Sequence, residues 1–212
     1  METLISDLLK GLMFPEISEG ENFPPDPWFE SLCSSICLSV FRLGENELGD
    51  SGVKLVSVAL RNPECKIQTL WLDTVGLTDS GAEDLAAALS TNPSLMELNL
   101  SYNELGDSGV KLVSAALGNP ECKILKLQLW KVGLTDSGAE DLASALSTNP
   151  SLTVLDLRYN SLTDRSVPAL RRLILTLPSL ERILLYSNRF SWTGEKELRS
   201  LQEPRPGLRV IV

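Results

Sequence analysis

LMELNLSYNEL, residues 95–105, is the stretch that decides the fold. Leu98 and Leu100 alternate with Glu97, Asn99 and Ser101, so a short strand here would bury the leucines on one face and turn the polar residues to the other. Residues 152–162, LTVLDLRYNSL, repeat the arrangement. The pattern predicts short, half-buried strands that recur along the chain.

The recurrence has a fixed period. LGDSGVKLVSVALRNPECKI at residues 48–67 returns as LGDSGVKLVSAALGNPECKI at residues 105–124, and the block at 76–95 returns at 133–152 with one change. The last leucine of each strand motif marks units of 28 or 29 residues; these markers are Leu43, Leu72, Leu100, Leu129, Leu157 and Leu185. Two kinds of unit therefore alternate, and the near-identity implies duplication.

A helix is predicted after each strand. Ala82, Leu85, Ala86 and Leu89 follow the i, i+3, i+4, i+7 spacing of one apolar helix face. Ser80 with Glu83, and Ser137 with Glu140, match a capping box at the helix start. The Asn-Pro pairs at 92–93, 119–120 and 149–150 are expected to end the helices.

Such a strand–helix unit cannot bury both of its apolar faces alone, so neighbouring units must stack. The stretch at residues 95–105 fits the LxxLxLxxNxL pattern of leucine-rich repeats. The predicted fold class is therefore α/β: a leucine-rich-repeat solenoid of about six units. Helices are wider than the spacing between strands, so we expect a short curved arc with parallel strands on the concave face and helices on the convex face.

The alternation of 28 and 29 residues resembles ribonuclease-inhibitor-like repeats. The phrases GLTDSGAEDLAAALSTNPSL and LNLSYNELGDSGVKLVSAALGNPECKI look especially like the repeats of NACHT-domain (NOD-like, pyrin-containing) innate immune receptors, including inflammasome receptors. This resemblance implies a non-catalytic protein–protein recognition module for ligand sensing or autoinhibition. The alternative is a ribonuclease-inhibitor-like protein that occludes an enzyme active site.

The resemblance covers about residues 36–212 and leaves out a nucleotide-binding domain, because the sequence has no GxxxxGK[ST] loop. A repeat-only relative, an isoform and a fragment of a larger receptor all remain open. Residues 1–35 fall outside the period: an apolar Met1–Met13 helix and an acidic, proline-rich linker predict an amino-terminal cap, with a partner-docking helix as the alternative. Residues 36–212 form the repeat domain, and residues 208–212 are expected to be a last edge strand.

Catalytic chemistry is not indicated. The sequence has no histidine, so it offers no Ser-His or Cys-His pair, and its four cysteines do not make a metal site. Cys65 and Cys122 occupy equivalent positions and are expected to be small buried hydrophobes. We expect no enzyme activity, no cofactor and no metal.

Location follows from what the amino end lacks. It has neither the basic region nor the small-residue cleavage site of a secretory signal, and no apolar run is long enough for a membrane span. We therefore expect a cytoplasmic protein without membrane contact.

Charge is distributed unevenly along the chain. The net charge is -9, yet residues 152–212 hold ten basic and six acidic residues. Net acidity argues against nucleic acid as the main ligand. The basic end could meet an acidic protein partner or, in head-to-tail self-association, the acidic end of another copy; solvated helix faces are the plainer explanation of the charges.

The predicted strand register turns one set of residues toward the concave face. Tryptophan, tyrosine and arginine among them are the residue types that dominate binding hot spots. Because Tyr102 and Tyr159 occupy equivalent positions, they could instead be repeat-packing residues. The candidate partner-binding residues are Trp71, Asp73, Glu97, Asn99, Tyr102, Gln128, Trp130, Asp156, Arg158, Tyr159 and Tyr186.

Overall fold

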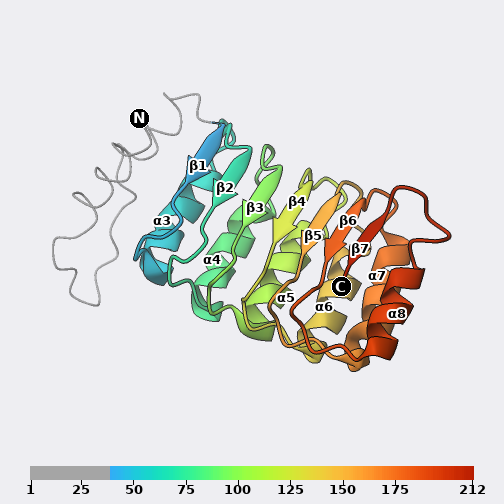
Figure 1. Cartoon of the computed structure of the whole chain (residues 1–212). Coiled ribbons are helices and arrows are strands. Elements are labelled where there is room, and N and C mark those ends of the chain that lie inside the picture. Colours follow the sequence, from blue (N-terminus) through green and yellow to red (C-terminus); the bar gives the residue numbers. More distant parts are fainter. Residues whose placement is uncertain (1–38) are drawn as a thin grey trace.

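A computed structural model of the chain describes residues 39–212. Strands and helices alternate in the order β1 (Val40–Arg42), α3 (Gly49–Leu60), β2 (Thr69–Trp71), α4 (Asp79–Leu89), β3 (Glu97–Asn99), α5 (Gly106–Leu117), β4 (Lys126–Gln128), α6 (Asp136–Leu146), β5 (Val154–Asp156), η1 (Asp164–Ser166), α7 (Val167–Thr176), β6 (Arg182–Leu184), α8 (Trp192–Ser200) and β7 (Arg209–Ile211). The seven strands of the described residues form one parallel sheet in sequence order. Strands line one side of the arc and helices the other (Figure 1). The predicted solenoid is confirmed.

The core runs through every unit as a stack of leucines. Leu98 and Leu100 are fully buried, as are Leu155 and Leu157 two units later, and all belong to one continuous hydrophobic cluster. Strand partners fall at the same repeat position, so Leu98 pairs with Leu127. The period of the sequence is therefore the period of the core.

A buried asparagine closes the turn after β3 and the turn after β5. The Asn103 side chain accepts hydrogen bonds from the backbone N–H groups of Val75 and Leu77 at 3.2 and 3.0 Å, and it donates to the carbonyls of Leu72 and Leu100. Asn160 makes the same bonds two units later. These side chains satisfy backbone groups of two units at once, which locks neighbouring turns together.

An aspartate at the start of one helix holds the start of the next. Asp50 accepts from the N–H and hydroxyl of Thr78 at 2.8 and 2.7 Å, and Asp107 holds Thr135 in the same way. Thr78, whose hydroxyl accepts from the N–H of Ser80, is the N-cap of α4. The capping boxes expected at Ser80 and Ser137 are thus wrong: both serines lie inside the helices, because the preceding threonines are fixed by the neighbouring unit.

Asp136 continues this series and predicts a pH dependence of stability. Partial burial opposes its ionisation, but hydrogen bonds from Thr163 and Ser166 and the charge of Arg165 hold the pKa of Asp136 below its ordinary value. A depressed pKa stabilises the folded state above the unfolded-state pKa of about 4, and that contribution is lost as the pH falls toward the folded value.

We therefore expect Asp136→Asn to be less stable than the native protein at pH 7, with the gap narrowing as the pH is lowered from 5 toward 3. Urea unfolding across this range measures the gap. A gap that stays constant with pH would show that the Asp136 charge contributes nothing.

The carboxy-terminal end is closed by side chains. The Arg205 guanidinium donates to the carbonyls of Ile174, Pro178 and Leu180, at 2.5 to 2.8 Å, and so ties the last turn to α7 and the chain after it. β7 pairs with β6 in register, which confirms the predicted terminal strand. The amino-terminal cap predicted for residues 1–35 lies outside the described residues.

The two repeat cysteines differ from each other. Cys65 is buried, as expected, whereas Cys122 is only half-buried, and burial raises the pKa of its thiol. Both thiols are unpaired. Cys33 and Cys37 lie outside the described part of the chain.

Candidate functional site: the concave face

Parallel pairing sets the candidate residues out in rows across the concave face. Glu97 of β3 lies beside Lys126 of β4, and Asn99 lies beside Gln128, which itself neighbours Asp156. The structure thus brings the candidates predicted from separate units onto one continuous surface. Arg42 and Trp71 are aligned by the same register on β1 and β2.

Four aromatic rings from successive units form a continuous line, which we call the aromatic ridge: Tyr102, Trp130, Tyr159 and Tyr186. The ring centroids of Tyr102 and Trp130 are 4.3 Å apart at 74°, and the next two spacings are 6.0 and 5.9 Å. Edge-to-face pairs of this kind contribute about 0.5–1.5 kcal/mol each beyond burial. The ridge is therefore a preformed surface whose rings hold one another in place.

The backbone beneath the ridge fixes its spacing. Tyr102 and Tyr159 adopt positive φ values of 55° and 54° in the turns after β3 and β5. Their N–H groups donate to the carbonyls of Trp130 and Tyr186, one unit further on. Tyr102 and Tyr159 remain 42% and 50% exposed, so packing between repeats leaves much of each ring available.

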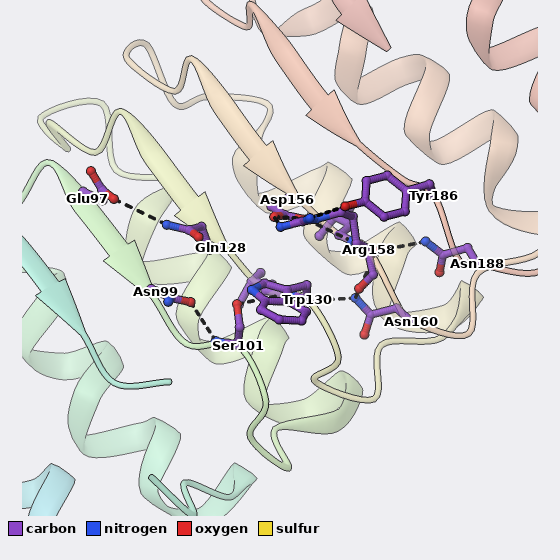
Figure 2. Close-up of polar contacts among 12 residues, drawn as sticks. Glu97, Asn99, Ser101, Gln128, Trp130, Asp156, Arg158, Asn160, Tyr186 and Asn188 are labelled. Atoms are coloured by element: carbon purple, nitrogen blue, oxygen red, sulfur yellow. Dashed lines mark hydrogen bonds and ion pairs between the residues drawn. The ribbon is translucent and has the colours of Figure 1, made fainter. Parts of the chain in front are cut away.

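Arg158 lies close to two rings of the ridge, Trp130 and Tyr186 (Figure 2). Its guanidinium pairs with both Asp156 oxygens, with Nη2 2.5 Å from Oδ2, and also donates to the Tyr186 hydroxyl. Its carbon Cζ lies 5.2 Å from the Trp130 ring centroid and 5.0 Å from that of Tyr186. The hydrogen bonds to Asp156 are the main cause of the raised pKa of Arg158, so these contacts favour its charged form.

Two of the predicted contact residues are buried. Asn99 and Asp156 are 6% and 3% exposed. Asn99 accepts from the N–H of Ser101 and donates to Asp73, while Asp156 holds Arg158. Both point toward the concave side yet are covered, so they position neighbouring side chains and offer a partner almost no surface.

Glu97 and Gln128 are half-buried members of the same face. Glu97 accepts from Lys126 Nζ at 3.1 Å. It also accepts from Gln128 Nε2 at 3.4 Å (Figure 2). This cluster leaves the middle of the face polar and close to neutral.

The amino-terminal part of the face contains a residue that sequence reasoning missed. Arg42 lies over Trp71, with its carbon Cζ 4.2 Å from the ring centroid, and Trp71 Nε1 is covered without an acceptor among the described residues. Burial raises the pKa of Asp73, and the charge of Glu45 adds to the effect. Arg42 could have been found from its register with Trp71, one unit earlier in the repeat.

The side chains on the concave face are of kinds that suit binding to another molecule. In residues 39–212 no cluster of three or more His, Cys, Asp or Glu side chains could hold a metal ion. The same residues contain no helix that is both long and apolar enough to cross a membrane. The face presents aromatic rings and arginine, which are side-chain types enriched at the centres of protein interfaces.

Comparison with known proteins agrees with the fold. A family model described as "Leucine Rich repeat" matches residues 91–114 and 148–170. Ribonuclease inhibitor from Sus scrofa is 36% identical over 82% of this chain and 38% of its own length. NACHT, LRR and PYD domains-containing protein 3 from Homo sapiens is 36% identical over 85% of the chain and 18% of its own length.

Two further matches add little to the assignment. The Bos taurus NACHT, LRR and PYD domains-containing protein 3 is 46% identical over 60% of this chain and 12% of its own. A solved internalin from Listeria monocytogenes aligns with 74% of this chain and 36% of its own at a TM-score of 0.46 and 19% identity, an overlap too low to bear on function. The chain thus spans less than half the length of the ribonuclease inhibitors and less than a fifth of the NACHT proteins.

Proposed function

We propose that this chain is a non-catalytic module that binds a protein partner through its concave face. Its leucine-rich repeats are similar to those of ribonuclease inhibitor and of NACHT, LRR and PYD domains-containing proteins, which supports the proposal. The aromatic ridge is the observation that carries the proposal. It places large, partly exposed rings and a fixed cation on one surface. We place the module in the cytosol, in a ligand-sensing or autoinhibitory role.

The rigidity of the ridge supports this function. Ordering side chains at an interface costs roughly 0.5–1.5 kcal/mol per mobile side chain. Tyr186 and Arg158 are already held by hydrogen bonds, and Trp130 contacts rings on both sides. A partner that docks on this surface therefore meets side chains that are already ordered.

Photo-crosslinking tests the proposed face without knowledge of the partner. A photoreactive amino acid replaces Tyr159 on the ridge in one variant and Leu112 on α5 in the other; the native side chains are 50% and 38% exposed. Irradiation in cytosol should give discrete protein adducts from position 159 and none above background from position 112. Adducts only from position 112, or from neither position, would contradict the proposal.

The second candidate is occlusion of a nuclease, which the match to ribonuclease inhibitor over 82% of this chain favours. Mass spectrometry of the adducts distinguishes the two. A ribonuclease at position 159 would support the inhibitor function, and a receptor component or another regulatory protein would support the recognition module.

A further inference from the structure

Two arginines face each other at the carboxy-terminal end of the concave face. Arg182 of β6 and Arg209 of β7 are direct partners in the parallel register, and both side chains are exposed. Neighbouring strands lie about 4.8 Å apart, so the two cations start from adjacent positions on one face. Like charges opposite each other in a sheet are unfavourable.

Neither guanidinium has a partner within residues 39–212. Three other arginines of this end form ion pairs: Arg171 pairs with Glu197, Arg172 with Glu140 and Arg199 with Glu195. No ion pair or side-chain hydrogen bond joins Arg182 or Arg209 to any described residue, and Glu181 contributes its backbone carbonyl to the Arg209 N–H. A carboxylate brought by a ligand would accept hydrogen bonds from both guanidinium groups and reduce the repulsion between them.

Apolar side chains lie directly beside the two arginines. Leu184 and Ile211 are the next residues on the same face and are also partners in the register. Leu184 is half-buried and Ile211 is 39% exposed. The surface therefore alternates from a cationic pair to an aliphatic pair along the strand direction, and Tyr186 lies two residues beyond Leu184.

The outer edge of β7 is partly occupied. The N–H of Val210 donates to Gln202 Oε1 at 3.0 Å, and Arg199 Nη2 donates to the Val212 carbonyl at 2.7 Å. Because these groups are taken, strand addition at this edge is disfavoured. A ligand for the two arginines must instead lie across the concave face and use its side chains.

We propose that Arg182 and Arg209 bind an acidic, extended segment of a protein partner, with a carboxylate between the two guanidinium groups and an adjacent apolar side chain against Leu184 and Ile211. This inference rests on the proposed recognition function and specifies the chemistry of the partner. Charge complementarity supports it, since residues 152–212 carry ten basic and six acidic residues.

The test uses the full chain and a fluorescein-labelled peptide of alternating glutamate and leucine, followed by fluorescence anisotropy. R182Q/R209Q should weaken binding at least tenfold, while R182K/R209K, which keeps the charge, should retain most of the affinity. R171Q/R172Q removes the same charge from α7 and is the matched control, with peptide affinity expected within twofold of the native protein.

Thermal unfolding checks that each variant folds. R209Q alone should not lower the midpoint temperature of unfolding, because it removes a like-charge pair.

Three results would overturn the inference. The first two are that the native chain does not bind the peptide, or that R171Q/R172Q weakens peptide binding as much as R182Q/R209Q does. The third is that a single-stranded oligonucleotide of equal charge binds the native chain as tightly as the peptide and loses as much affinity in R182Q/R209Q. The last result would indicate a general polyanion site. The photo-crosslinking experiment separates this inference from the proposed function. If adding R182Q/R209Q to the chain with the photoreactive residue at position 159 leaves its protein adducts unchanged, the recognition function stands and only the acidic-partner inference fails.

Discussion

Replacing Asn160 with alanine is expected to destabilise the fold by about 3–5 kcal/mol, because each buried polar group left without a partner costs roughly 1–3 kcal/mol. Asn160 is 7% exposed and accepts from the N–H groups of Val132 and Leu134, both at 3.1 Å. It also donates to the Leu129 carbonyl at 2.8 Å. Alanine removes all of these bonds and leaves a cavity between two units.

Urea unfolding measures this loss, with two variants as references. Asn160→Asp keeps an acceptor for the two N–H groups but loses the donors, so it should lie between the native protein and Asn160→Ala. Asn119→Ala removes a single bond to the Glu121 N–H in an exposed turn and should cost less than about 1 kcal/mol. If Asn160→Ala costs no more than Asn119→Ala, the buried asparagines do not hold the units together.

Much of this architecture is visible in the sequence, because the physical unit and the sequence unit coincide. Leu98 and Leu100 predicted the strand and its buried side, and the interval between equivalent leucines predicted the parallel register. The asparagine of the LxxLxLxxNxL pattern, seen at Asn103 and Asn160, was part of the same signal.

Contacts between units were harder to predict. The helix start at Thr78 depends on Asp50, a residue 28 positions earlier, whereas the local sequence favoured Ser80. Equally, alternation gives the direction of Asn99 and Asp156 but not their burial, which depends on neighbouring side chains.

For the aromatic ridge, too, the sequence predicted one part of the arrangement and not the other. The sequence predicted that Tyr102, Trp130, Tyr159 and Tyr186 share a face. It could not predict that turn geometry brings their rings within 4.3 to 6.0 Å of one another, because positive φ values at Tyr102 and Tyr159 decide where those side chains begin.

The concave face should lose its partner when its rings are removed. The test variant carries alanine at four positions: Trp71, Tyr102, Trp130 and Tyr159. Truncating a hot-spot residue costs about 2 kcal/mol or more of binding free energy, so the variant's affinity for the partner should fall by more than about a hundredfold. Trp192→Ala is the matched control, because Trp192 is 74% exposed on α8 and away from the ridge contacts. Circular dichroism and thermal unfolding establish that both variants fold.

The decisive measurement is quantitative capture of cytosolic proteins on the immobilised native chain, the fourfold alanine variant and Trp192→Ala. Recognition through the concave face predicts proteins retained by the native chain and by Trp192→Ala but lost from the fourfold variant. Retention of the same proteins by all three chains would contradict the assignment of the concave face as the binding surface.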